Sequence, residues 1–393
     1  MSNVANGRTI VLFLGAGFSK DAGLPVMSEF ADASKRDFDG LQKHASAPPE
    51  DVHYRHAARM LVDAGAVFSA FRTFCAKSGT LSPEALGNLE TIFCIAEAMR
   101  EAAIVKVEIA GQSYGMDQVV REMQIWTWKI YQQYPLTTRQ VRKIAHPETF
   151  DRFFRTLKDS GILDRLVVIT TNYDLVYECQ AYMADVPCFY PLEQGRESNA
   201  GNDGRSRFCY VGPSDTGKVP VCKLHGSVNY FYDPVRDMQD APFVFTDLAG
   251  DKPVGKSRLA PRVPAILAVD AIWNIREKLG GALTPAIIPP TYAKLTGQPW
   301  LRAIWNRAFQ ALANARKIVF IGYGMPDSDG FMRALVHGAM ATRGSGSAPE
   351  IHVIDPSEDT RSRYEKLFLH GIRSWPKGLG DVTEGELQEI FRA

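Results

Sequence analysis

The sequence predicts an α/β protein built on an open, doubly wound parallel sheet. The chain contains short apolar runs of β-forming residues, at 8–14, 166–171, 219–226, 317–324 and 350–355. These runs are continuously apolar rather than alternating, which is typical of strands buried on both faces. Helical patterns separate them, as expected when crossover helices join parallel strands.

The ends of these runs are polar. Each run ends in Gly, Asn, Asp or His and is followed by polar turn residues. In open α/β sheets, ligands bind beyond the carboxyl ends of the strands. The candidate functional residues therefore stand where this fold places its chemistry.

A long helical segment separates the first two runs. Ser82-Pro83 is a suitable helix start, with serine as the N-cap and proline at the first helical position. A crossover needs only about a dozen or more residues, so the excess predicts an insertion. We expect a single domain over 1–393 with a helical insertion subdomain at 30–145. Helical periodicity covers 54–77, 83–104, 116–133 and, before the second run, 147–160.

Composition narrows the class of protein. Hydrophobic residues make up 45% and charged residues 23%, and the formal net charge is +1, so no global field attracts nucleic acid or an anionic membrane. The six cysteines form no CxxC pair, so we expect no metal site. No apolar run reaches the ~20 residues that span a bilayer, and the start of the chain lacks a signal-peptide pattern. We therefore expect a cytoplasmic protein.

Two segments rich in Gly, Pro, Asn, Ser and charged residues are expected to be irregular. They cover 193–217 and 232–262. Long irregular segments in a compact domain often serve as lids or contact loops.

A glycine turn follows the first run. Gly15-Ala16-Gly17 lies between a buried strand and a helix start. Glycine permits positive φ and close backbone approach to a pyrophosphate, and a helix N-terminus favours anionic oxygens. The Walker pattern and the dehydrogenase pattern GxGxxG are both absent, so a P-loop NTPase and a hydride-transfer enzyme are disfavoured. The alternative is that the glycines serve packing only.

Taken together, the motifs resemble those of the sirtuin superfamily. In chain order they are GAGFSKDAGLP (15–25), TTNYD (170–174), KLHGS (223–227), GYGMPDSD (322–329) and VIDPS (353–357). The resemblance covers a Rossmann-like core from about residue 8 to 357 and implies that the chain binds NAD.

The departures from the deacylase pattern indicate a different branch. The two zinc-binding CxxC pairs of sirtuin deacylases are missing, and Val26-Met27-Ser28 replaces Asp-Phe-Arg after Pro25. The helical insertion and IIPPT (287–291) resemble instead the sirtuin-like effectors of bacterial antiphage defence. That branch implies hydrolysis and depletion of NAD in abortive infection, in a homo-oligomer or beside a partner ATPase or nucleic-acid-sensing subunit.

The resemblance also implies a catalytic set. Asn172 would hold a water or the nicotinamide ribose, and His225 would act as a general base. Asp174 would accept a hydrogen bond from the carboxamide or fix its loop. The structural alternatives are that Asn172 or Asp174 caps a helix and that His225 is an ordinary loop residue. NAD would be the substrate, and no metal is implied.

The same resemblance implies a set of NAD-binding residues. They are Gly15, Ala16, Gly17, Phe18, Ser19, Pro25, Thr171, Gly322, Tyr323, Gly324 and Asp355. Asp355 has a structural alternative, because Asp-Pro-Ser is a common turn. Asp327 and Asp329 are expected either to cap the helix that follows or to contact the ligand.

The sequence therefore favours an NAD glycohydrolase that releases nicotinamide and ADP-ribose. The alternative is a sensor that binds NAD or an ADP-ribose-type ligand and gates a partner without turnover. A zinc-free deacylase is a weaker third hypothesis. The trigger, the partner and the choice between ADP-ribose and a cyclic product are left open by the residues.

Overall fold

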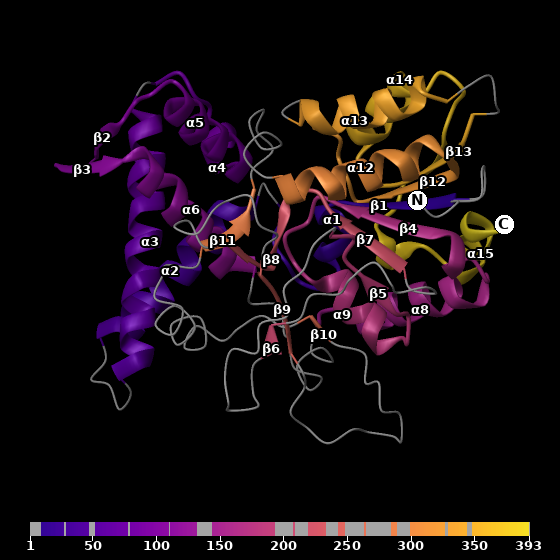
Figure 1. Cartoon of the computed structure of the whole chain (residues 1–393), viewed down its shortest axis with the longest axis horizontal. Coiled ribbons are helices and arrows are strands. Elements are labelled where there is room, and N and C mark those ends of the chain that lie inside the picture. Colours follow the sequence, from indigo (N-terminus) through magenta and orange to yellow (C-terminus); the bar gives the residue numbers. More distant parts are fainter. Residues whose placement is uncertain are drawn as a thin grey trace.

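A parallel sheet forms the centre of the molecule (Figure 1). In spatial order its strands are β14 (Arg373–Trp375), β13 (Glu350–Ile354), β12 (Ala315–Ile321), β1 (Thr9–Leu14), β4 (Leu166–Thr170), β7 (Val219–Lys223) and β5 (Cys188–Phe189). Every neighbouring pair is parallel. The computed structural model describes residues 9–26, 29–46, 52–77, 79–109, 111–131, 144–192, 207–208, 219–232, 243–247, 263–264, 284–288, 299–326, 329–343 and 348–392.

Helices cover both faces of this sheet, so the predicted doubly wound, Rossmann-like fold is confirmed. Figure 1 shows α12 (Pro299–Ala313), α13 (Gly330–Ala341) and α14 (Glu358–Leu367) on one side. On the other side lie α8 (Pro147–Asp159), α9 (Val176–Met183) and α15 (Glu384–Phe391). The 3-10 turns η2 (Leu163–Arg165) and η3 (Leu379–Asp381) complete this part of the chain.

The five apolar runs correspond to β1, β4, β7, β12 and β13. All residues of β1, β4 and β7 are buried, which explains their lack of alternation. The edge strands β5 and β14 were not predicted. They have only two and three residues, too few to produce a periodic signal.

The chain from α2 to α6 forms a helical group on one side of the sheet, at the left of Figure 1, whereas α1 (Ala16–Lys20) stays beside the parallel sheet. The predicted Ser82 N-cap is confirmed, because its side chain accepts a hydrogen bond from Ala85 N. Asn88 divides the predicted helix 83–104 in two by capping the second part. Whether 30–145 is a separate subdomain stays a prediction. The elements are α2 (Phe30–Ser46), α3 (Val52–Ala76), α4 (Pro83–Gly87), α5 (Leu89–Glu101), β2 (Lys106–Ile109), β3 (Gln112–Gly115) and α6 (Met116–Tyr131).

A second, antiparallel sheet lies between the helical group and the parallel sheet. Its order is β10 (Val263–Pro264), β9 (Phe243–Asp247), β8 (Gly226–Tyr232) and β11 (Thr284–Ile287), and β6 (Arg207–Phe208) also pairs with β9. Its β8 and β11 are tied to α6, because Trp128 Nε1 donates to Val228 O (2.9 Å) and Gln124 Nε2 donates to Ile287 O (2.9 Å).

The prediction that 193–217 and 232–262 are irregular is partly wrong. The strand β9 (FVFTD) lies within 232–262, because a short β-forming stretch pairs there with β8 although Pro, Asp and Gly surround it. Most of 193–217 lies outside the described residues, and its described residues 207–208 form β6.

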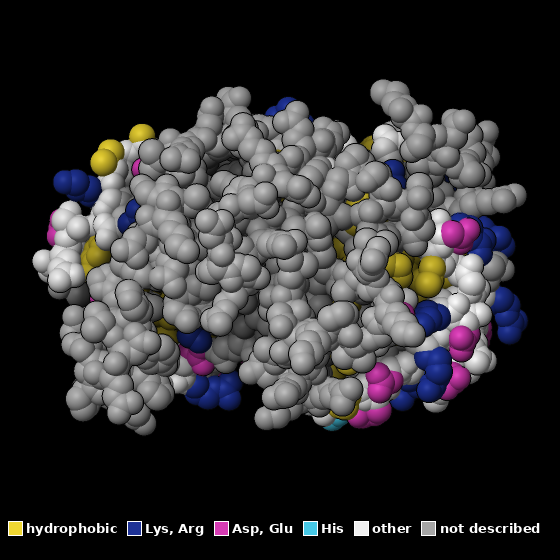
Figure 2. All heavy atoms as spheres, turned by 60° about the horizontal axis from the view of Figure 1, so that its bottom comes forward, with side chains coloured by type: hydrophobic (Ala, Val, Ile, Leu, Met, Phe, Trp, Pro, Cys, Tyr) yellow, Lys and Arg dark blue, Asp and Glu magenta, His cyan; other side chains and the backbone are white. Residues whose placement is uncertain are grey.

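Basic and acidic side chains are interspersed on the described part of the surface in Figure 2. This agrees with the near-zero net charge of the chain. In the part of the chain that the structure describes, no helix has both the length and the apolar character needed to cross a bilayer.

Candidate functional site

The candidate site lies at the carboxyl end of β1, where the winding of the sheet changes direction. From β1 the chain reaches β4, β7 and β5 on one side and β12, β13 and β14 on the other. Ligands of open α/β sheets bind at such a switch point. The residues that follow β1, β4, β7 and β12 include Gly15, Asn172, His225 and Gly322. The fifth motif follows the parallel strand β13, so the topology brings all five sequence motifs to one edge.

The glycine turn is packed directly against the turn after β12. Gly15 N donates to Ile321 O (3.0 Å), and Gly17 N donates to Gly322 O (2.9 Å). A Cβ atom on Gly17 would lie 2.7 Å from Gly322 Cα, and one on Gly15 would lie 2.5 Å from Tyr323 Cα. These glycines are therefore required by the contact between two loops.

This finding corrects one sequence expectation. Gly15 has a φ of −114°, and Gly17 lies inside the short helix α1 (Ala16–Lys20), so neither uses the left-handed region. Within the motif at 15–25 the positive φ belongs to Gly23, at +91°, and in the turn after β12 it belongs to Gly322, at +60°. Gly15 and Gly17 each donate their backbone N–H to the end of β12 or the turn after it. Between them, the Ala16 N–H donates to no acceptor among the described residues.

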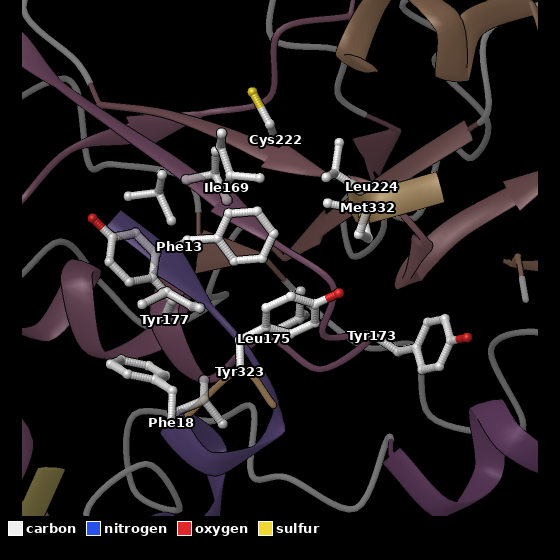
Figure 3. Packing of buried hydrophobic residues seen from close by; sticks show 14 of the residues in the cluster. Phe13, Phe18, Ile169, Tyr173, Leu175, Tyr177, Cys222, Leu224, Tyr323 and Met332 are labelled. Carbon is white, nitrogen blue, oxygen red and sulfur yellow. The ribbon is translucent and has the colours of Figure 1, made fainter. Parts of the chain in front are cut away.

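Phe18 belongs to the core. Its ring packs against Phe150, Phe153 and Tyr177 from α8 and α9, with centroid distances of 5.4, 5.7 and 6.3 Å. Figure 3 shows Phe18 and Tyr177 on the same side of the cluster. The Phe18 side chain is therefore turned away from the surface that a nucleotide would use, and its backbone N–H already donates to Gly15 O.

Asn172 joins the end of β4 to the glycine turn. Its Nδ2 donates to Gly15 O (2.9 Å) and to Ser19 Oγ (3.0 Å). These bonds fix the orientation of the amide, because both Nδ2 protons are used. Its Oδ1 accepts no hydrogen bond from the described residues, and the side chain does not cap a helix.

Asp174 lies behind Asn172 in a buried network. Its Oδ1 accepts from Val176 N (2.9 Å), and its carbonyl oxygen accepts from Lys223 Nζ. Burial raises the pKa of the Asp174 carboxyl, while the Lys223 ammonium, the Val176 N–H and the Ser19 hydroxyl act in the opposite direction. These contacts favour the structural alternative for Asp174, in which it fixes the loop.

Lys223 and Glu178 form a fully buried ion pair beneath this loop. Lys223 Nζ lies 3.2 Å from Glu178 Oε1, and each side chain is 1% exposed. Tyr190 OH donates to the same Glu178 oxygen (3.2 Å). Burial raises the pKa of Glu178, and Lys223 partly counteracts this effect. The pair links β7, which leads to His225, with α9, which follows Asp174.

His225 follows β7 and is held by its backbone neighbours. Its carbonyl accepts from Ile288 N (2.9 Å), and the carbonyl of Leu224 accepts from Trp305 Nε1 (3.0 Å). Gly226 adopts a φ of +75°, which turns the chain sharply into β8. The imidazole is 1% exposed and lies beside the ring of Tyr173, with a centroid distance of 6.2 Å.

The turn after β12 supplies a carboxylate to His225. Asp329 caps α13 by accepting from Met332 N, and its Oδ2 lies 3.8 Å from His225 Nε2. Tyr323 OH donates to the same Oδ2 (2.8 Å), and the Tyr323 ring packs on Phe13 (4.8 Å), as Figure 3 shows. The expected capping role of Asp329 is confirmed, whereas Asp327 lies outside the described residues.

The remaining predicted binding residues are spread around this edge. Thr171 N donates to Leu14 O (3.3 Å), and Gly324 O accepts from Arg363 Nη1 (2.7 Å). Pro25 lines a separate surface pocket of about 460 Å³, which neither Asn172 nor His225 lines. This pocket is otherwise formed by Gly23, Leu24, Glu29, Asp32, Lys35 and Arg36.

Asp355 is engaged in its own turn. Its Oδ1 accepts from Ser357 N (2.8 Å), and its carbonyl accepts from Arg361 Nη1 (2.9 Å). Burial raises the pKa of the Asp355 carboxyl, and the Ser357 N–H and the arginines oppose this rise. These contacts favour the turn alternative for Asp355.

Sequence reasoning missed the partners of the predicted residues. Lys223 lies within the KLHGS motif, and a lysine in a strand buried on both faces requires a buried partner. Glu178 and the contact between Asp329 and His225 had no signal in the sequence, because they depend on how separate strands are arranged. Among the described residues, no group of acidic, His or Cys side chains is arranged to hold a metal ion.

No family model matches the chain, and no curated protein sequence is similar to it. Solved sirtuin structures are similar over nearly the full length of the chain. Sir2Tm bound to a propionylated peptide has 10% identity and a TM-score of 0.42, and the match covers 98% of this chain and 94% of that chain. Sir2 in complex with 2'-O-acetyl-ADP-ribose and a deacetylated p53 peptide has 10% identity and a TM-score of 0.38, with 98% and 95% covered.

Proposed function

We propose that this chain hydrolyses the nicotinamide–ribose bond of NAD to give nicotinamide and ADP-ribose. One observation carries the proposal. Thr170 of β4 is in register with Lys223 of β7, and Asn172 and His225 each follow this pair by two residues. Because neighbouring strands lie ~4.8 Å apart, the two side chains start from adjacent points at the switch-point edge. Polar side chains converging there are typical of a binding site.

The chemistry demands little covalent participation from the protein. Nicotinamide loses its positive charge as it departs, and the ribose develops positive charge at the carbon that a water attacks. The protein must orient that water and remove its proton. The unbonded Oδ1 of Asn172 can accept a hydrogen bond from the water or from a ribose hydroxyl, and the His225 imidazole can accept the proton.

The glycine turn offers fewer backbone N–H groups to a diphosphate than its sequence suggests. The N–H groups of Gly15 and Gly17 are used within the protein, and the Ala16 N–H keeps its capacity to donate. The neighbouring β12 turn, with Gly322 and Gly324, closes the same edge. We therefore assign Ala16 N–H as the phosphate donor of this turn.

The decisive experiment measures nicotinamide release from NAD by purified protein beside Asn172→Ala and His225→Ala. General base catalysis and water orientation are each worth roughly 10²–10⁴-fold, so each variant should lose at least 100-fold in rate. Ser82→Ala is the matched control, because it removes an exposed helix cap far from this edge and should keep the native rate. Native release that survives both substitutions would contradict the proposed site.

The same experiment separates the ligand-sensor alternative. A sensor would bind NAD in calorimetry and leave it intact on incubation. A zinc-free deacylase would remove acetyl groups from a peptide only when NAD is present. The absence of both binding and release would mean that the glycine turn serves packing alone.

The proposed biological role rests only on the resemblance of the sequence motifs. We propose an NAD-depleting role in bacterial antiphage defence, in a homo-oligomer or beside a partner ATPase or nucleic-acid-sensing subunit. Light scattering at micromolar concentration tests the oligomer, and a monomeric mass would contradict it.

Ser19 should position Asn172 without taking part in the chemistry. Its hydroxyl accepts from Asn172 Nδ2 and donates to Asp174. Removing a hydrogen bond within a buried network costs about 1–3 kcal/mol, so Ser19→Ala should lower the rate of nicotinamide release roughly 5- to 100-fold. A rate equal to that of the native chain would show that Gly15 O alone orients the amide.

A further inference from the structure

We propose that Asp329 is a positioning residue for His225, holding the imidazole in the orientation that its role as a base requires. This inference deepens the proposed function and rests on it for the meaning of His225. The contact itself, between two residues more than 100 positions apart, is a feature of the folded chain.

The two carboxylate oxygens of Asp329 have different neighbours. One carboxylate oxygen, Oδ1, accepts from Met332 N (3.4 Å) and so caps α13. The other, Oδ2, accepts from Tyr323 OH at 2.8 Å and lies 3.8 Å from His225 Nε2. The carboxylate is 2% exposed and the imidazole 1%, so bulk water screens their attraction weakly.

The carboxylate is held in place from two sides. The helix cap fixes Asp329 to α13, and the Tyr323 hydroxyl fixes its second oxygen. Tyr323 is itself fixed, because its carbonyl accepts from Tyr364 OH (2.8 Å) and its ring packs on Phe13 (4.8 Å). A carboxylate with so little freedom can select one orientation of a neighbouring imidazole. His225 Nε2 lies 3.8 Å from this carboxylate, beyond hydrogen-bond distance, so the carboxylate acts on the ring by charge and favours the protonated imidazole.

Other titratable groups near His225 act differently. Tyr173, whose ring lies beside the imidazole, stays neutral, because burial raises its pKa well above the ordinary value of 10.0. Burial has the same effect on Tyr131 of α6, which packs on Tyr173, and on Tyr323. The Glu90 carboxylate of α5 contributes negative charge from farther away, raising the pKa of Tyr173 and Tyr323, and Cys94 raises that of Tyr173.

Asp329→Asn is the variant that tests this role. Asparagine caps helices as well as aspartate does, so the change removes the negative charge while keeping the cap. Asp329→Ser offers a second cap without the charge. Asp329→Ala removes both charge and cap and shows what loss of the structural role alone adds.

The first measurement is the titration of the His225 ring proton by NMR, with the signal assigned by its loss in His225→Ala. An opposite charge within about 4–6 Å favours the charged form of an ionisable group by one or more pH units. The titration midpoint of His225 should therefore fall by roughly 1 pH unit in Asp329→Asn. This measurement needs no turnover, so it tests the contact even if the chain releases no nicotinamide.

The second measurement is the pH profile of nicotinamide release. In Asp329→Asn the acid limb should move to lower pH by the same amount, and the rate above that limb should fall at least 10-fold while KM changes less than kcat. An unchanged His225 titration in both Asp329→Asn and Asp329→Ser would overturn the inference. Absence of release by the native chain, with the His225 shift present, would instead contradict the proposed function and leave the His225–Asp329 contact supported.

Discussion

Replacing Lys223 by methionine should destabilise the chain by about 3–5 kcal/mol at neutral pH, because removing one partner leaves a buried charge uncompensated. Lys223 and Glu178 are both 1% exposed, and methionine fills a similar volume without a charge. The Lys223 bond to the Asp174 carbonyl is lost as well. The midpoint of urea unfolding, followed by tryptophan fluorescence, measures the effect.

The loss should depend on pH in a definite direction. Burial already places the pKa of Glu178 above its ordinary value of 4.5, so folding disfavours its ionised form. Removing the lysine raises that pKa further. The deficit of Lys223→Met relative to the native chain is therefore largest at neutral pH and shrinks as the pH falls toward and below 4.5, where Glu178 is protonated in both states.

A double variant serves as the control. Lys223→Met combined with Glu178→Gln removes both charges and keeps a side chain that can accept from Tyr190 OH. It should recover most of the lost stability. If the double variant is no more stable than Lys223→Met, the loss arises from the Asp174 carbonyl bond rather than from the isolated charge.

Gly322→Ala should push the turn after β12 away from the glycine turn after β1. A Cβ on Gly322 would lie 2.5 Å from both Cα and C of Gly17, and φ at Gly322 is +60°. Left-handed backbone costs roughly 1–2 kcal/mol for alanine, and forced overpacking a further 1–3 kcal/mol. We expect a total loss of about 2–5 kcal/mol and at least a 100-fold loss of nicotinamide release, because the β12 turn also carries Tyr323 and, farther on, Asp329.

Gly40→Ala is the matched control for this substitution. Gly40 lies in α2, and a Cβ there would meet nothing within 4 Å. Alanine in a helix is favoured over glycine by roughly 0.5–1 kcal/mol, so this variant should be as stable as the native chain or slightly more so. Equal behaviour of the two variants would show that the contact between the loops can relax without cost.

The sequence predicted the frame of the fold because its central strands are buried on both faces. Residues such as Val11, Val168 and Ile318 come from runs without alternation, and the helices between them start at recognisable caps such as Ser82. The β2–β3 hairpin and the short edge strands could not be predicted in this way. The alternation of apolar and polar residues in β2 (KVEI) spans four residues only, and β3, β5 and β14 carry no apolar period, so pairing with a neighbour defines these strands.

The site was predictable at its strand ends and unpredictable in its contacts. Asn172 and His225 follow apolar runs, so the fold class alone places them at one edge. That Asn172 would use both amide protons on Gly15 and Ser19 depends on how α1 meets β4. The same holds for Asp174, whose neighbour Lys223 comes from the next strand, and for Asp329, which reaches His225 from a turn after β12.

The position of β1 at the middle of the sheet has a consequence for how the protein is made. Ile10 pairs with Leu166 on one side and with Lys317 on the other, so β1 is synthesised long before either neighbour. At about 5–20 residues per second, roughly 15–60 s separate it from β12. During that time a strand that is apolar from Ile10 to Leu14 has no partner on that side, and such long-range parallel pairing is slow and prone to aggregation. The yield of soluble chain should therefore rise when cells are grown at low temperature and when chaperones that cover exposed strands are plentiful.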